Sequence, residues 1–419
     1  MSKVRTIWDV AKRLVRQTLP RTQSSRDSKP QPEAAAVAQT LNRKRALILH
    51  IGAHKTGTTA IQDFLEQSRN SLAEKGWDVL DVNGVTNLGN TIAFRSRPDG
   101  RAIFHFHPHM LDTITKALAA GDSNKIISAE DLFFLNQDDD LRRLSASVKT
   151  LGFEVKIIVY LRNQVDMGVS NKAQGARTSQ SALVFGNDKR SVLPELNINT
   201  LEYLNYHQKL EMWKSHFPDA TFILRKYDRS QLIGKDSVTD FVHICQLPVA
   251  PIKMSRNKTG GSKLTNLLHD LRLHGLEPSV AWNLHNGGLL LDDGGIEQSP
   301  SAKQATAFMA AFAKENWKIA QTYGIDLNID CSTFPDEEIR QPDDIDFIYK
   351  NITSILNTLC KAHLPRTAST LRDSAIILED VDLKQAYALM QIAHAMRPAD
   401  QHIQRKLEEY KNELGIMDE

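Results

Sequence analysis

A loop between an apolar run and a helical pattern holds the residues best suited to chemistry. Residues 52 to 59 read GAHKTGTT, after the run ALILHI and before the helically spaced IQDFLEQ. Glycines, a lysine and threonines at such a junction can bind a phosphate, because backbone amides and the helix N-terminus point at the anion. The stretch therefore predicts a phosphate-binding loop.

The position of the lysine argues against ATP as the ligand. Gly52 and Gly57 have the G-x4-G spacing of a Walker A loop, which then requires a lysine where this chain has Thr58. The lysine here is Lys55, which precedes the second glycine and meets a different side of the loop. The amides of residues 56–59 can still bind an anion, so phosphate binding is kept while the ATP-specific geometry is lost.

Four apolar runs are expected to form the strands that position this loop: RALILHIG, NKIISAED, VKIIVYLR and ATFILRKY. Helical patterns separate them, at residues 60–75, 110–120, 138–150 and 200–215. Strands that alternate with helices predict an α/β fold with a mainly parallel sheet flanked by helices. The stretches GAHKTGTT, SAED and LRNQVDMGVS all begin at predicted strand ends, where such folds bind ligands.

The chain is expected to have three parts. Residues 1–44 read as a basic amphipathic helix and a flexible linker, residues 45–335 as the α/β domain, and residues 336–419 as an α-helical extension. The last part resembles a single tetratricopeptide-like hairpin at residues 380–416, which would serve docking or capping. Residues 1–19 would lie on an anionic membrane surface, with a disordered or self-packing leader as the alternative.

Charge and composition exclude several classes of protein. Residues 1–45 hold eleven Lys and Arg against three Asp and Glu, a charge of +8, and the remainder holds 41 against 47, a charge of −6. A basic head on a mildly acidic body does not favour nucleic-acid binding. Because the chain lacks a long apolar run and a secretory signal, we expect a cytoplasmic protein, peripheral to the inner membrane through its head. The three cysteines are far apart and predict buried thiols.

The stretch HKTGTTAIQ resembles the 5′-phosphosulfate-binding loop of the sulfotransferases, which use 3′-phosphoadenosine-5′-phosphosulfate (PAPS). The second element of that family is a strand that ends in arginine, followed eight residues later by serine, and Arg162 and Ser170 match it. The stretches IISAEDLF, FILRKYDRSQLIGKDSVTDFVHICQLP and FMAAFAKENWKIAQTYG resemble bacterial carbohydrate-type members. The resemblance covers residues 45–335 and departs from the family at Ala53 and at residues 256–261.

The resemblance implies a P-loop NTPase-like sulfotransferase fold and a role for each matched residue. Lys55 would neutralise the charge on the departing 3′-phosphoadenosine-5′-phosphate (PAP). Glu130 or His54 would take the proton from the acceptor hydroxyl, Glu130 being the first candidate. The residues expected to bind the nucleotide are Lys55, Thr56, Gly57, Thr58, Thr59, Arg162, Ser170 and Asn257.

The predicted function is transfer of a sulfuryl group from PAPS to a hydroxyl of a glycan or glycolipid, with an amine as the alternative acceptor. The transfer needs no metal, and His105, His107 and His109 are expected to form a wall of the acceptor pocket rather than a zinc site. Two rivals stay open. One is an ATP-dependent small-molecule P-loop kinase, and the other is a catalytically silent binding module whose C-terminal helices dock a protein partner.

Overall fold

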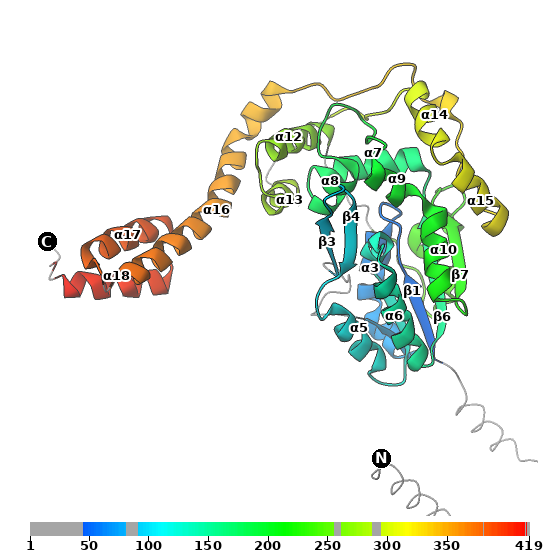
Figure 1. Cartoon of the computed structure of the whole chain (residues 1–419), viewed down its shortest axis with the longest axis horizontal. Helices are drawn as coiled ribbons and strands as arrows, with labels where there is room; N and C mark the ends of the chain where they lie inside the picture. The colour runs from blue at the N-terminus through cyan, green and yellow to red at the C-terminus, as the bar shows by residue number, and fades with distance from the viewer. Residues whose placement is uncertain are drawn as a thin grey trace, which may run out of the picture. The chain divides into compact units, whose positions relative to one another are not determined.

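A five-stranded parallel sheet organises the α/β domain (Figure 1). The computed structural model describes residues 45–80, 91–254, 261–286, 295–379, 381–414 and 416. The strand order is β2-β5-β1-β6-β7, and each neighbouring pair runs parallel. The strands are β1 Ala46–His50, β2 Trp77–Val79, β5 Asn124–Ser128, β6 Glu154–Leu161 and β7 Thr221–Lys226. The predicted α/β fold with a mainly parallel sheet is confirmed.

Successive residues of the central strand β1 contact two separate apolar cores. Leu47 and Leu49 pack with α5, α6 and α10, whereas Ile48 packs with α3 and α11. Both faces of the sheet are therefore covered, which explains why its central strands are continuous apolar runs. These helices and their neighbour α4 are α3 Thr58–Gln67, α4 Arg69–Ala73, α5 Met110–Ala119, α6 Asp138–Thr150, α10 Tyr206–His216 and α11 Ser237–Cys245.

The register of the parallel strands brings three strand ends to one edge of the sheet. His50, the last residue of β1, pairs with Ser128, the last residue of β5. On the other side of β1, the amide of Ala53 donates to the carbonyl oxygen of Tyr160 at 2.9 Å. The segments that follow β1, β5 and β6 are therefore neighbours in space, as their positions in the sequence predict.

A buried carboxylate joins the strand–helix unit after residue 220 to the sheet. Asp240 of α11 has no exposed surface and accepts hydrogen bonds from the Tyr160 hydroxyl at 2.9 Å and from Arg225 Nε at 3.0 Å. It also accepts from the amide of Ile233 at 2.9 Å. A buried charge is tolerated only when such partners satisfy it, so this carboxylate fixes α11 against β6 and β7.

An antiparallel hairpin was not among the predicted elements. Strands β3 Ile92–Ser96 and β4 Ala102–Phe106 pair with each other outside the parallel sheet. The turn between them contains the sequence RPDGR, and Pro-Asp-Gly between apolar runs is a turn signal that could have revealed the hairpin. The Phe104 ring stacks on Phe134 at 4.7 Å, which fastens the hairpin beside the segment that follows β5.

The remaining helices lie mainly in the second half of the chain. Gln164 at the start of α7 exchanges two side-chain hydrogen bonds with Asn316 of α15, at 2.7 and 3.0 Å. The described helices are α7 Gln164–Gly175, α8 Ser179–Phe185, α9 Ile198–Leu204, α12 Ser262–Leu273, α13 Pro278–Asn286, α14 Ala302–Ala310, α15 Ala313–Tyr323, α16 Ile345–Leu378, α17 Leu383–Met396 and α18 Gln401–Glu413. The last three share a small apolar core, and the assignment of residues 380–416, which contain α17 and α18, as a tetratricopeptide-like hairpin stays a prediction.

Candidate active site

The loop between β1 and α3 has the backbone of an anion-binding turn. Gly52 and Gly57 have φ angles of 115° and 82°, and Lys55 also lies in the left-handed region, with a φ of 61°. The Thr56 hydroxyl donates to the carbonyl oxygen of Ala53 at 2.6 Å, so it braces the loop from inside. The N-cap residue of α3 is Gly57, which has no side chain to cap the helix, so the amides of the first turn can bind an anion.

The two threonines that follow Gly57 differ in their exposure. Thr58 is 3% exposed and opens α3, whereas Thr59 is exposed in the same turn. A Cβ atom at Gly57 would lie 2.6 Å from the Ser237 hydroxyl oxygen, closer than real Cβ contacts come. The loop therefore depends on glycine at position 57, both for its left-handed φ and for the close approach of α11.

Lys55 is held against α7, at the centre of a group of cations. Its Nζ atom donates to Gln174 Oε1 at 2.9 Å. Burial lowers the pKa of Lys55 to about 8, with the positive charges of Arg177 and Arg162 adding to the effect and Glu130 opposing it. An anion placed among these cations would relieve their repulsion, so the arrangement suits a ligand with several negative charges.

Arg162 and Ser170 stand where a second phosphate could bind. Arg162 follows the last residue of β6, and Asp166 holds its guanidinium through Nε and a terminal nitrogen, both at 3.2 Å. Asn163 caps α7 by accepting from the amide of Asp166 at 2.9 Å. Ser170, half-buried on α7, makes no hydrogen bond with the described residues, so its hydroxyl is available to a ligand.

Helix α7 and the residues after it supply two groups that the sequence analysis did not single out. Ser170, Gln174 and Arg177 are spaced i, i+4 and i+7, which places them on one face of a helix. Burial lowers the pKa of Arg177 to about 10 and that of His285 to about 4, and the two side chains are hydrogen-bonded. The neutral imidazole of His285 therefore accepts from Arg177 at neutral pH. The helical spacing after Arg162 was the signal that could have found Gln174 and Arg177.

Glu130 and His54, the two candidate proton acceptors, lie near each other in different environments. Burial raises the pKa of the Glu130 carboxyl; the neighbouring Asp131 adds to the effect, while His54 and Lys55 oppose it. Glu130 makes no hydrogen bond or ion pair with the described residues. A carboxylate with a raised pKa and no internal partner is well placed to accept a proton from a ligand.

Both ring nitrogens of His54 are already engaged. Nδ1 lies 2.7 Å from the Tyr203 hydroxyl and Nε2 lies 3.3 Å from Asp131 Oδ1. Burial raises the pKa of Tyr203 well above its usual value, so its hydroxyl stays protonated and can donate to Nδ1. The proton of the ring then lies on Nε2, facing Asp131. This geometry leaves the carboxylate of Glu130, rather than the ring of His54, available to a proton from a ligand.

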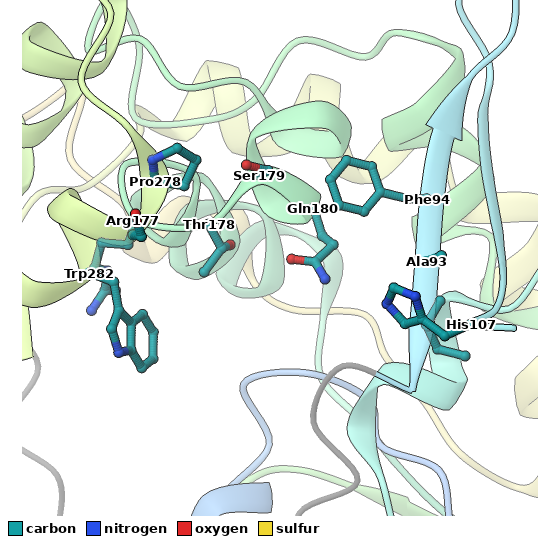
Figure 2. A pocket seen from close by; sticks show the side chains of 11 residues that line it. Ala93, Phe94, His107, Arg177, Thr178, Ser179, Gln180, Pro278 and Trp282 are labelled. Atoms are coloured by element: carbon teal, nitrogen blue, oxygen red, sulfur yellow. The ribbon is translucent and has the colours of Figure 1, made fainter. Parts of the chain in front are cut away.

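An open pocket of about 440 Å³ lies beside the cation group (Figure 2). Arg177, Thr178 and Gln180 form part of its wall, and the hairpin contributes Phe94 and His107. Figure 2 shows Trp282 and His107 on opposite sides of the pocket, with Thr178 and Gln180 between them. Arg177 thus belongs both to the pocket and to the cations around Lys55.

The structure places the histidines at the end of the hairpin, and the other residues considered for the site, in different surroundings. His107 lines the pocket, while a ring nitrogen of His105 lies 2.9 Å from the carbonyl oxygen of Phe106. Within the described part of the chain, no group of three or more His, Cys, Asp or Glu could hold a metal ion. Asn257 and residues 1–19 lie outside the described residues. Lys172 is buried and donates to the carbonyl oxygen of Leu193 at 3.1 Å, so it supports the structure.

The fold and this arrangement of residues agree with the comparison to known families. The model of the sulfotransferase domain matches residues 45–257, about half of the chain, and the protein therefore belongs to the sulfotransferase family. The matched region contains the loop after β1, Glu130, Arg162 and Ser170. No curated protein matches the chain. None of the helices in the described residues is long and apolar enough to cross a membrane.

Proposed function

We propose that this sulfotransferase transfers the sulfuryl group of PAPS to a hydroxyl of a glycan or glycolipid, with an amine as the alternative acceptor. The observation that carries the donor assignment is the convergence of Lys55, Arg162 and Arg177 next to an uncapped helix N-terminus. PAPS has a phosphosulfate at one end of its ribose and a 3′-phosphate on the ring. A ligand with two separated anionic groups fits a loop and an arginine–serine pair that lie on neighbouring strand ends.

In the proposed transfer, Glu130, Lys55 and His54 each have a separate role. The acceptor oxygen forms a bond to sulfur, the bond between sulfur and the phosphate oxygen breaks, and the proton of the hydroxyl moves to Glu130. Lys55 stabilises the negative charge that develops on the phosphate of the leaving PAP. Tyr203 and Asp131 hold His54 in place beside the acceptor.

The pocket in Figure 2 is our candidate for the acceptor site. Phe94 and Trp282 offer aromatic rings, on which the C–H faces of a sugar can pack. Thr178, Ser179 and Gln180 offer hydroxyl and amide groups that can bind sugar hydroxyls. This mixture of rings and neutral polar groups supports a carbohydrate acceptor, and Arg177 gives the pocket direct contact with the donor site.

The donor assignment is tested by calorimetric titration with PAP and with ATP. PAP should bind without a metal ion and ATP much more weakly, because Thr58 stands where an ATP-binding loop has its lysine. Binding of ATP alone would favour the P-loop kinase, and binding of neither would favour the silent binding module. Transfer of labelled sulfate from PAPS to fractionated glycans and lipids would then identify the acceptor class.

The role of Glu130 is tested by the variant Glu130→Gln. Its kcat should fall by about 10²–10⁴-fold, the usual contribution of a general base, while the Kd for PAP changes little. Glu74→Gln is the control, since Glu74 is exposed in the turn after α4. An unchanged kcat in Glu130→Gln, together with a large loss in His54→Gln, would assign the base to His54 instead.

Two further parts of the proposal concern location and partners. The basic head would hold the enzyme at the inner membrane surface, near lipid-linked acceptors. Deletion of residues 1–40 should then shift the protein from the membrane fraction to the soluble fraction, and unchanged fractionation would refute this. Docking of a protein partner on the C-terminal helices also stays a proposal, consistent with the exposed Ile377 and Val381 at the turn between α16 and α17.

A further inference from the structure

A second pocket, of about 200 Å³, lies at the turn of the hairpin, and we call it the Lys209 pocket. Its charged lining residues are Arg97, Arg101, Glu202 and Lys209. Tyr203 and Phe134 form its aromatic wall. None of these four charged residues belongs to the cation group around Lys55.

Lys209 is the unusual member of this lining. Its side chain is only 7% exposed, and Nζ lies 5.4 Å from the ring centre of Phe133 and 5.3 Å from that of Tyr203. It makes no hydrogen bond or ion pair with the described residues. Two aromatic faces offset part of the cost of burying an ammonium group, but they do not supply the hydrogen-bond acceptors that it has lost from water.

The other charges of the pocket leave Lys209 without a partner. Arg101 lies 3.6 Å from Glu202, and Arg97 lies 3.8 Å from Asp99. Two arginines and two carboxylates therefore pair among themselves, and the ammonium of Lys209 is the remaining charge. Burial lowers the pKa of Lys209 to about 8, with Glu202 opposing the shift, so the side chain is still mostly protonated at pH 7.

The pocket shares two of its wall residues with the surroundings of His54. The hydroxyl of its wall residue Tyr203 is 2.7 Å from His54 Nδ1, and the ring of its wall residue Phe134 packs on His54 at 4.3 Å. The hairpin also links it to the candidate acceptor pocket. Phe94 lines the acceptor pocket and Arg97, three residues on, lines the Lys209 pocket, a span of about 10 Å in an extended chain.

We propose that the Lys209 pocket binds an oxyanion carried by the acceptor, a carboxylate or a sulfate ester, while a neighbouring sugar occupies the acceptor pocket. The acceptor would then be an acidic glycan. This inference rests on the proposed function for the identity of the acceptor, but the anion site itself depends only on the pocket. A free inorganic anion is the other source of the same chemistry.

The test compares two matched probes on protein saturated with PAP, which occupies the donor site. One probe is a tetrasaccharide that contains glucuronate, and the other is the same tetrasaccharide with its carboxyl groups reduced to alcohols. Wild-type protein should bind the acidic form at least about tenfold more tightly, as expected for a charge-assisted hydrogen bond. Lys209→Met should lose this preference, because methionine keeps the apolar stem and removes the charge.

Two further variants make the result decisive. Lys214→Met is the matched control, since Lys214 is exposed on the same helix outside the pocket, and it should keep the preference. Arg101→Met changes a half-exposed side chain and should weaken acidic binding even if Lys209→Met folds poorly. Equal binding of the two probes by wild-type protein, or an unchanged preference in Lys209→Met, would overturn the proposal.

Thermal unfolding in the presence of inorganic sulfate distinguishes an anion carried by the acceptor from a free inorganic anion. If sulfate protects wild-type protein but not Lys209→Met against thermal unfolding, and neither tetrasaccharide binds, the ligand is a free anion and the acidic acceptor is ruled out. A failure of PAP to bind would count against the proposed function alone. In that case the same titration on wild-type protein and on Lys209→Met without nucleotide still tests the Lys209 pocket.

Discussion

Binding of PAP should weaken as the pH rises from 7 to 9, because Lys55 loses its proton in that interval. Its pKa lies at about 8 in the free protein, lowered first by burial and then by Arg177 and Arg162. A phosphate beside the ammonium favours the charged form and so restores a higher pKa in the complex. Nucleotide binding is therefore linked to the uptake of a proton.

The size of the effect follows from the pKa of Lys55. With a pKa of about 8, about nine tenths of the lysine is protonated at pH 7 and about one tenth at pH 9. If the lysine stays protonated in the complex, the Kd for PAP should rise about tenfold across these two pH units. At pH 8 each binding event should take up about half a proton.

Calorimetric titration in two buffers with different heats of ionisation measures this proton uptake directly. Lys55→Met should bind PAP more weakly at pH 7 and lose the dependence on pH between 7 and 9. Glu130→Gln and Lys209→Met are the controls, because Glu130 has a raised pKa and Lys209 also has a pKa of about 8. Lys209→Met should keep the wild-type slope, and Glu130→Gln should keep a slope that begins at lower pH, because the Glu130 charge raises the pKa of Lys55.

Two results would refute this reasoning. A Kd for PAP that is constant from pH 7 to 9 in wild-type protein would mean that Lys55 is not the titrating contact. A slope that persists in Lys55→Met and disappears in one of the two controls would assign the proton to that other residue.

Three shorter predictions concern the framework of the site. Gly57→Ala should lower the melting temperature and the affinity for PAP, because a left-handed alanine costs about 1–2 kcal/mol and its Cβ would clash with Ser237. Gly76→Ala is the control for the backbone cost alone, since Gly76 has a similar φ of 77° and a Cβ there would have no atom within 4 Å. Asp240→Ala should reduce the free energy of unfolding by about 3–5 kcal/mol in denaturant titrations, since it removes the buried acceptor of the Tyr160 hydroxyl and of the Ile233 amide and the ion-pair partner of the partly exposed Arg225. A loss below about 1 kcal/mol would contradict that role. Tyr203→Phe should lower kcat/KM about fivefold, for about 1 kcal/mol of lost hydrogen bond to His54, while PAP binding measured by calorimetry stays unchanged.

Much of the fold could be predicted because its signals are local. The four longer strands of the parallel sheet are continuous apolar runs, and the helices between them show their own periodicity, so β1, β5, β6 and β7 were found from the sequence alone. The short strand β2 and the hairpin β3–β4 were not, although Pro-Asp-Gly marks the turn of the hairpin. Their pairing depends on contacts with distant residues, such as the stacking of Phe104 on Phe134.

The proximity of Lys55 and Arg162 was equally accessible from the sequence. Lys55 and Arg162 each follow a strand, and parallel strands place their carboxyl ends at one edge of the sheet, so local patterns imply that the two meet. The displaced lysine argues against an ATP-binding loop from the sequence alone.

Only the tertiary structure decided which side chains have hydrogen-bond partners and which are buried. His54 and Tyr203 are 149 residues apart, yet their hydrogen bond occupies one ring nitrogen and favours Glu130 as the base. The choice between Glu130 and His54 could not be made from the sequence, because it depends on which polar atoms already have partners. Likewise, nothing local distinguishes Lys209 from Lys214 on α10; packing buries the first between two rings and leaves the second in solvent. The positions of strands and helices along the chain follow from short-range patterns, whereas strand pairing, burial and charge environment arise from contacts between distant segments.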